Sequence, residues 1–325
     1  MSNELDIFNL DANSLINPPK KKNAEIYQPA ADKGKDGIYK ALIRFLPNVR
    51  NPEKSKMMKY YVWLVDPVSN ESYSVDCPST VGKRSILKDT YWKLKNSASV
   101  RDQELAQEKL GRAESYYSLV QVVKDSNEPD LEGKVMVFKF GAKINQKIEK
   151  LLKPEFGAPI NPYDVFEGKM FALHITKKQK WNNYDLCEFV GEKMPLEIEG
   201  KPIQKTKEDM AKVVEWLKAN SPELEKYEYR EWDQAMHDKV VKTIKNIVPD
   251  ARLVEQLLGS AGSAPAGGLD ITLKKKDKSD DMFDSTPKAS KAEERRAETS
   301  VAEAEAPVEK KTGKVSNIDD LYDNL

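Results

Sequence analysis

Six short segments between residues 39 and 177 carry the residue pattern of β-strands. They are rich in β-branched and aromatic residues, and polar clusters containing Asn, Asp, Pro or Gly separate them. Several short strands joined by irregular connections are typical of a closed β-barrel or a sandwich. The predicted strands cover residues 39–46, 60–66, 72–76, 116–124, 134–140 and 169–177.

The hydrophobic period becomes helical after Thr206. Thr206 and Asp209 have the spacing of a helix-capping pair, and the apolar residues that follow recur on one helix face, at Met210, Val213, Val214 and Leu217. Further helices are predicted from Ser221-Pro222, through residues 240–247 and after Pro249-Asp250. The long connection at residues 78–115 is expected to hold one helix, near residues 102–110. The C-terminal helices are expected to pack on or beside the strands.

Both ends of the chain lack a core-forming pattern. Residues 1–37 contain few aromatic residues and a run of three lysines, so we expect a flexible arm. Residues 259–325 are rich in Gly, Ala, Lys and Glu, which predicts a disordered tail. Its acidic and apolar tip is typical of a partner-binding segment, and the residues expected to bind are Asp319, Asp320, Leu321, Tyr322 and Asp323.

Composition and charge agree with a folded centre and solvated ends. The 325 residues are 39% hydrophobic and 33% charged, and the net charge is zero. Lys and Arg exceed Asp and Glu between Ile38 and Met194, whereas acidic residues are in excess from Gly259 onward. A basic body with an acidic tail is found in some nucleic-acid-binding proteins.

The two cysteines and the absence of long apolar runs indicate the compartment. Cys77 and Cys187 are far apart in sequence, which favours reduced thiols inside a cell. No stretch reaches the 18 or so apolar residues of a membrane span, and the N-terminus has no signal-peptide pattern. We therefore expect a cytoplasmic protein that makes no membrane contact.

No catalytic signature is present, so we expect a protein that is not an enzyme. The sequence has no phosphate-binding loop, no nucleophile elbow and no zinc-protease motif. The residues around each of the two histidines favour an ordinary surface role for it. His174 alternates with Leu173 and Ile175 on a predicted strand, and His237 lies among charged residues.

Aromatic residues interleaved with Lys and Arg are the feature that points to a ligand. Single strands of nucleic acid bind where bases stack on exposed rings and cations follow the phosphates. Exposure is the preferred interpretation for Trp181 and Tyr184, and core packing and base contact are equally favoured for Phe138. Core packing is preferred for Tyr60, Trp63, Phe140, Phe171 and Phe189. The candidate binding residues are Tyr91, Trp92, Arg112, Tyr116, Tyr117, Phe138, Lys139, Lys143, Trp181 and Tyr184.

Four sequence blocks and the C-terminal end give a resemblance to a known family. The blocks are IRFLP at 43–47, SYYSLVQVVKD at 115–125, EGKVMVFKFGAKINQKI at 132–148 and FEGKMFALHITKKQKWNNYD at 166–185. In order and spacing they resemble the single-stranded DNA-binding, or helix-destabilising, proteins of T-even-like bacteriophages. The terminal IDDLYDNL is similar to the acidic end of that family.

The resemblance implies a fold, a ligand and partners. It implies a mainly β chain with helices, built on an OB-fold, which is a five-stranded Greek-key barrel. This core would cover residues 38–200 with an inserted subdomain at about 78–115, and residues 201–258 would form a helical part packed on it. It also adds Arg44 and Tyr73 to the expected DNA-binding residues.

The resemblance also implies that the protein acts in the replication, recombination and repair of phage DNA, in the cytoplasm of the infected bacterium. A chain of this kind coats single-stranded DNA cooperatively and with little sequence preference, associating with itself through the N-terminal arm. Its tail would recruit replication proteins such as a polymerase, a helicase loader or a primase. A protein-interaction scaffold and an RNA-binding OB-fold regulator are the alternatives.

Two departures from the family alter these expectations. The family usually has a zinc site of one His and three Cys, but here only Cys77 remains, with neither a CxxC nor a histidine beside it. A structural zinc ion needs four such ligands, so we expect no metal and no cofactor. Apolar packing of Ile86, Leu87, Leu94 and Leu110 should hold the insertion instead. The family's N-terminal Lys-Arg-Lys-Ser-Thr motif is also missing.

Overall fold

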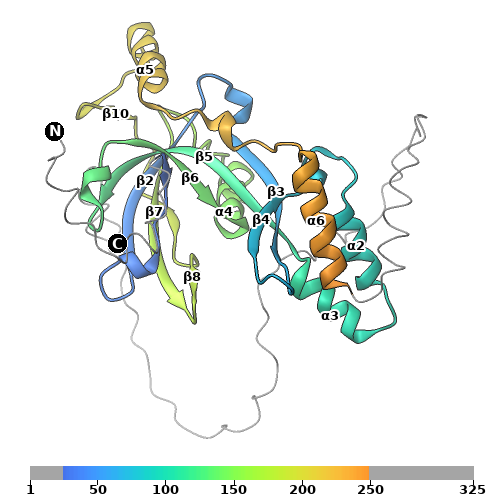
Figure 1. Ribbon diagram of the computed structural model, residues 1–325. Helices are drawn as coiled ribbons and strands as arrows, with labels where there is room; N and C mark the ends of the chain where they lie inside the picture. Colours follow the sequence, from blue (N-terminus) through green and yellow to red (C-terminus); the bar gives the residue numbers. More distant parts are fainter. Residues whose placement is uncertain (1–24, 249–325) are drawn as a thin grey trace, which may run out of the picture.

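The computed structural model describes residues 25–248 of the chain (Figure 1). They form a strand-rich mixed architecture, in which nine strands make one sheet and two make a small separate hairpin. The strands are β1 Ile26–Tyr27, β2 Tyr39–Leu46, β3 Lys56–Val65, β4 Ser72–Asp76, β5 Arg112–Asp125, β6 Val135–Phe140, β7 Met170–Lys178, β8 Trp181–Asn183, β9 Glu188–Val190, β10 Glu197–Ile198 and β11 Lys201–Pro202.

Helices occupy the connections and the C-terminal part of the described chain. The α-helices are α2 Ile86–Lys95, α3 Val100–Lys109, α4 Ala142–Leu152, α5 Lys207–Asn220 and α6 Gln234–Ile247. The 3-10 helices are η2 Ala31–Lys33, η3 Pro52–Lys54, η4 Pro78–Val81, η5 Pro129–Leu131 and η6 Leu224–Tyr227. Within residues 25–248, no helix is both long and apolar enough to cross a lipid bilayer.

The long strand β5 joins the two halves of the sheet. Its C-terminal half pairs with β2, its N-terminal half pairs with β3, and β6 pairs along its middle. β7 lies on the far side of β2 and carries β8 and β9. The structure thus confirms a mainly β chain with helices. These pairings do not by themselves define a Greek-key OB barrel, which remains a prediction.

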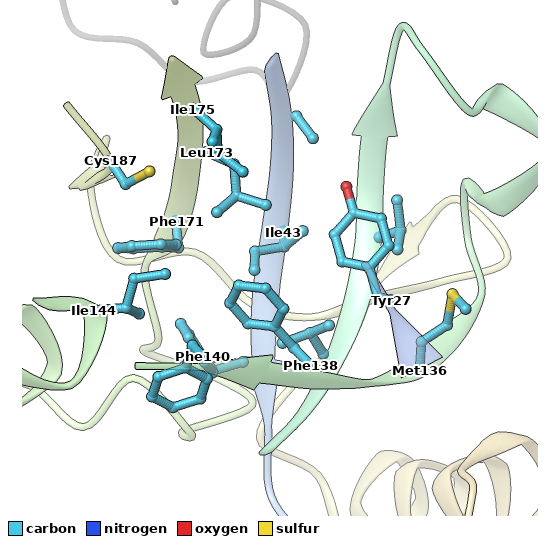
Figure 2. Packing of buried hydrophobic residues seen from close by; sticks show 14 of the residues in the cluster. Tyr27, Ile43, Met136, Phe138, Phe140, Ile144, Phe171, Leu173, Ile175 and Cys187 are labelled. Carbon is cyan, nitrogen blue, oxygen red and sulfur yellow. The ribbon is translucent and has the colours of Figure 1, made fainter. Parts of the chain in front are cut away.

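Alternation along β5 divides the sheet into two faces. Tyr116 points into a cluster that we call the inner core, which includes Phe45, Phe138, Phe140 and Phe171 (Figure 2). The Phe45 ring lies 5.7 to 6.4 Å, between centroids, from the rings of Phe138, Phe140, Tyr163, Phe171 and Phe189. Tyr117 points to the opposite, outer face, where α5 covers the sheet with Val213 and Leu217.

The insertion between β4 and β5 has its own core. Leu87, Leu94 and Leu110 are buried there against Val62 and Leu64 of β3, and Ile86 is partly buried, which confirms the predicted apolar packing. α6 also packs on this cluster, through Val240 and Ile244. The predicted helix at 240–247 is therefore present, and it covers the insertion rather than the inner core.

Residues 25–37 belong to the folded part rather than to a free arm. β1 pairs in parallel with β6, and Tyr27 is buried. The Tyr27 and Tyr39 hydroxyls donate to the buried Asp125 carboxylate at 2.7 and 2.5 Å, and burial raises the pKa of both tyrosines. The predicted arm boundary at residue 37 is therefore too far along the chain, because Tyr27 supplies both apolar area and a hydrogen bond to the core.

The predicted strands all appear, whereas some helices were missed. α2 and α4 were not expected, although the buried residues of each recur at helical spacing. The cap of α5 is present, with Thr206 accepting from the Asp209 amide. Ser221-Pro222 leads only into the 3-10 turn η6. The helix predicted after Pro249 and the acidic tail lie outside the described residues.

Candidate nucleic-acid interface

A set of cations and rings lies on the inner face, where β3 and β5 run past the inner core towards the insertion. The Arg112 guanidinium lies over the Tyr60 ring, 3.5 Å from its centroid, and Nη1 donates to Ser79 Oγ at 3.1 Å. The Lys56 ammonium lies 5.6 Å from the centroid of Tyr116. Contacts of this kind hold flexible cations over aromatic faces.

Helix α4 continues this set of side chains towards the β7–β8 hairpin. Lys56 Nζ donates to Asn145 Oδ1 of α4 at 2.8 Å. On the same helix Lys143 Nζ bonds to the Asp185 carboxylate at 2.5 Å, and Lys147 Nζ donates to the Asp185 carbonyl at 3.0 Å. The hydrogen bond from Lys143 lowers the pKa of Asp185. In Figure 1, α4 lies between β3 and β8.

The hairpin ends in an exposed ring among lysines. Trp181 is 61% exposed, as the polar sequence around it predicted. Lys177, Lys178 and Lys180 are exposed at the same turn. Tyr184, predicted to be equally open, packs instead against the inner core and is only partly accessible. We call the whole set the inner track; it comprises Lys56, Tyr60, Arg112, Tyr116, Lys143, Lys147, Lys177, Lys178, Lys180, Trp181 and Tyr184.

The inner track has more cations than carboxylates. Glu114 accepts from the Tyr116 hydroxyl at 2.7 Å, and Glu149 lies 3.6 Å from Lys56. Asp185 is a third carboxylate bonded to the track, through Lys143. An extended polyanion with flat bases fits this arrangement, since its phosphates can meet the lysines and its bases can stack on exposed rings.

Several predicted binding residues lie in cores instead. Phe138 is 1% exposed in the inner core, because it lies on the inward-facing side of β6, whereas Lys139 lies on the opposite side. Tyr91 fills the core of the insertion, and Tyr117 stacks on Tyr227 at 5.5 Å beneath the outer face. The side chains of Phe138, Tyr91 and Tyr117 are therefore not presented to a base in this structure. Tyr116 is also buried, at 9% exposed, and contributes to the track by lying under Lys56.

Three other predicted residues have positions away from the inner track. Tyr73 holds α6, since its hydroxyl shares a 2.8 Å hydrogen bond with Thr243 and its ring lies under Lys239. Trp92 is 41% exposed on α2, edge-on to Tyr91. Lys139 is exposed on the outer face of β6.

Two aromatic residues assigned to the core from sequence are in fact accessible. Trp63 is 57% exposed and Tyr60 is only partly buried. Strand alternation contained the signal for Trp63, because its neighbours Val62 and Leu64 are buried on the other face.

Arg44, the groove arginine implied by the resemblance, is completely buried on the outer side of β2. Nη2 donates to the Asp164 carbonyl at 2.9 Å, while Nε and Nη1 have no hydrogen-bond partner within residues 25–248. The absence of a side chain at Gly168 allows this loop to approach the guanidinium. Burial lowers the pKa of Arg44 to about 10. In this conformation a phosphate cannot reach it.

Replacing Arg44 with methionine should leave DNA affinity within about twofold. It should also keep or raise stability, because exchanging an incompletely paired buried charge for an apolar side chain of similar length is often neutral or stabilising by about 1–4 kcal/mol. Thermal unfolding and an oligo(dT) titration of R44M test this. A loss of affinity with normal stability would restore Arg44 to the DNA interface.

The β7–β8 turn holds Gln179 in the left-handed region, with φ of 57°. This conformation costs a non-glycine residue about 1–2 kcal/mol, part of which glycine recovers. We expect Gln179→Gly to raise the free energy of unfolding by roughly 0.5–1 kcal/mol. Denaturant unfolding measures this, and Lys180→Gly, at a turn position without positive φ, should destabilise instead. A destabilised Q179G would contradict the assignment of the turn.

The surroundings of Cys77 do not fit the family's zinc ion. The buried thiol lies 3.0 Å from Ser79 Oγ and 3.4 Å from Ser85 Oγ. Neutral hydroxyls are not the thiolate and imidazole donors of a structural zinc site. Across residues 25–248 there is also no group of three or more His, Cys, Asp or Glu side chains placed to hold a metal.

Comparison with known proteins identifies the family of this chain. Residues 36–228 match the model of a family described as gp32 DNA binding protein like. The single-stranded DNA-binding proteins of Enterobacteria phages T4 and T2 are each 29% identical over 175 residues, which is 52% of this chain and 56% of theirs. The chain thus spans about half the length of these relatives. Because the match covers more than half of the chain, including strands β2 to β11, the insertion and the inner track, the chain belongs to the gp32-like family of DNA-binding proteins, which are not enzymes.

Proposed function

We propose that this protein binds single-stranded DNA along the inner track. The observation that carries the proposal is the row of cations and rings from Arg112 over Tyr60, through Lys56 over Tyr116, to α4 and the hairpin that exposes Trp181. The similarity to the single-stranded DNA-binding proteins of phages T4 and T2 supports the same ligand.

The chemistry of the track favours binding with little sequence preference. Stacking contributes on the order of 1–3 kcal/mol per base and accepts every base, because each has a flat face. Lysine ammonium groups recognise phosphates, which are the same at every position. A closed duplex offers neither unstacked bases nor a flexible backbone, so single strands should be preferred.

Titration with fluorescently labelled oligo(dT) at increasing salt tests the proposal. We expect the logarithm of the association constant to fall linearly with the logarithm of salt, by about 0.7 per phosphate neutralised. Tryptophan emission should also be quenched, with Trp181→Phe reducing the quench. Absent binding, or binding that ignores salt, would refute the proposal. Competition by oligo(U) separates a DNA-binding from an RNA-binding protein.

We further propose the wider role that the family suggests. The protein would coat single-stranded DNA cooperatively during phage replication, recombination and repair in the infected bacterial cytoplasm. Its residues 1–24 would serve self-association, and its acidic tip would recruit replication proteins. Both segments lie outside the described residues. Deleting residues 316–325 should abolish capture of replication proteins while DNA binding persists; unchanged capture would overturn the role of the tip.

A further inference from the structure

The outer face of β3 and β6 carries a second group of rings and cations, which the proposed function does not use. We call it the outer patch and define it as Lys59, Tyr61, Trp63 and Lys139. Trp63 is 57% exposed in the middle of a strand, and its cross-strand neighbour on β4 is the small, exposed Ser74. One flat face of the indole is therefore open on an otherwise ordered sheet.

The two lysines of the outer patch lie over aromatic rings. Lys139 Nζ is 5.0 Å from the centroid of Tyr61 and 5.9 Å from that of Tyr117, and Lys59 Nζ is 5.4 Å from Tyr117. Tyr117 is itself held by its stack on Tyr227. The cations are thus held beside the partly exposed Tyr61 and the buried Tyr117 before any ligand arrives.

The patch has one carboxylate for two ammonium groups. Lys59 Nζ pairs with Asp76 at 2.7 Å, whereas Lys139 makes no ion pair among residues 25–248. Partial burial lowers the pKa of Lys139, and the positive charge of Lys59 lowers it further. A phosphate beside Lys139 would offset this repulsion, which favours an anionic ligand.

The patch is connected with the inner track around the end of β6. β1 covers β6 only at Val137 and Phe138, so beyond them β6 has no strand on that side within the described part of the chain. There Lys139 faces outward and Phe140 faces the inner core, with its ring stacked on Tyr116 of the track. A flexible strand leaving Lys56, which lies over Tyr116, can pass this edge to reach the other face.

We propose that the outer patch binds a second segment of the same DNA strand, with bases on Trp63 and Tyr61 and a phosphate at Lys139. The inference rests on the proposed function, since it extends the path of that ligand. An exposed indole and a partly exposed tyrosine ring with a cation beside them, next to the small Ser74, are suited to bases and phosphates rather than to a folded partner.

Variants of Trp63 test the proposal with two lengths of oligo(dT), about 8 and about 30 nucleotides. One OB fold usually covers about 4 to 16 nucleotides, so the short oligonucleotide fills only the inner track and the long one can also reach the outer patch. We expect Trp63→Ser to leave the short oligonucleotide unaffected and to weaken the long one by about fivefold or more. Trp63→Phe should recover most of that loss. Val68→Ser, at an apolar position on the β3–β4 turn that is 75% exposed, is the control.

A salt titration of Lys139→Gln adds an independent measurement. Its slope with the long oligonucleotide should fall by about 0.7, while the slope with the short one stays the same. If Trp63→Ser binds both lengths like the unmodified protein, the patch is not a DNA contact. If it weakens both equally, Trp63 belongs to the primary site and no second segment exists. If the unmodified protein binds neither, the proposed function itself fails.

Discussion

Replacing Arg112 with alanine should weaken binding to oligo(dT) by roughly 5- to 30-fold, or about 1–2 kcal/mol. Arg112 lies over Tyr60 and bonds to Ser79, so it joins the insertion to the inner track. Losing one phosphate contact should also reduce the salt slope by about 0.7. Affinity measured at several salt concentrations gives both quantities.

Two further variants make the Arg112 result specific. Arg112→Lys keeps the charge but loses the planar group above Tyr60, so it should recover the salt slope and only part of the affinity. Lys212→Ala removes a cation from α5, away from the inner track, and should change affinity by less than about twofold. If Arg112→Ala and Lys212→Ala behave alike, the cations of the chain act without a defined track.

Replacing Phe45 with alanine should lower the free energy of unfolding by about 3–5 kcal/mol, the usual cost of deleting a buried phenylalanine. Phe45 is completely buried, and five other aromatic rings surround it. For a domain of this size the melting temperature should fall by on the order of 10 °C. Thermal unfolding followed by circular dichroism measures the shift.

Phe156 provides the matched control for Phe45. It is 86% exposed, so Phe156→Ala removes the same atoms without opening a cavity. Its melting temperature should stay within about 2 °C of the unmodified protein. Equal effects of the two substitutions would show that Phe45 does not organise the inner core.

Strand positions were predictable because each strand carries its own signal. Alternation of apolar and polar residues is local, and all six predicted strands exist with shifts of a few residues. α4 carried a local signal too, since Ile144 and Ile148 recur at helical spacing, and it was overlooked. The position of α6 on the insertion depends on contacts more than 150 residues apart, such as Tyr73 with Thr243, which no local pattern records.

The candidate site was only partly predictable for the same reason. Trp181 was recognised because polar neighbours give it nothing to pack against. Phe138 and Lys139 could be placed on opposite faces from alternation, but which face is buried depends on what covers the sheet. Arg44 shows the limit most clearly, since the loop around Asp164 that buries it is 120 residues away.

Photo-crosslinking with oligo(dT) that carries 5-iodouracil tests the central claim most directly, because it reports which rings lie against the bases. After digestion, mass spectrometry identifies the crosslinked peptides. We predict crosslinks at Tyr60 and Trp181, at the two ends of the inner track. Crosslinks confined to exposed aromatic residues elsewhere, such as Phe156 or Trp92, with none at Tyr60 or Trp181, would contradict binding along the inner track.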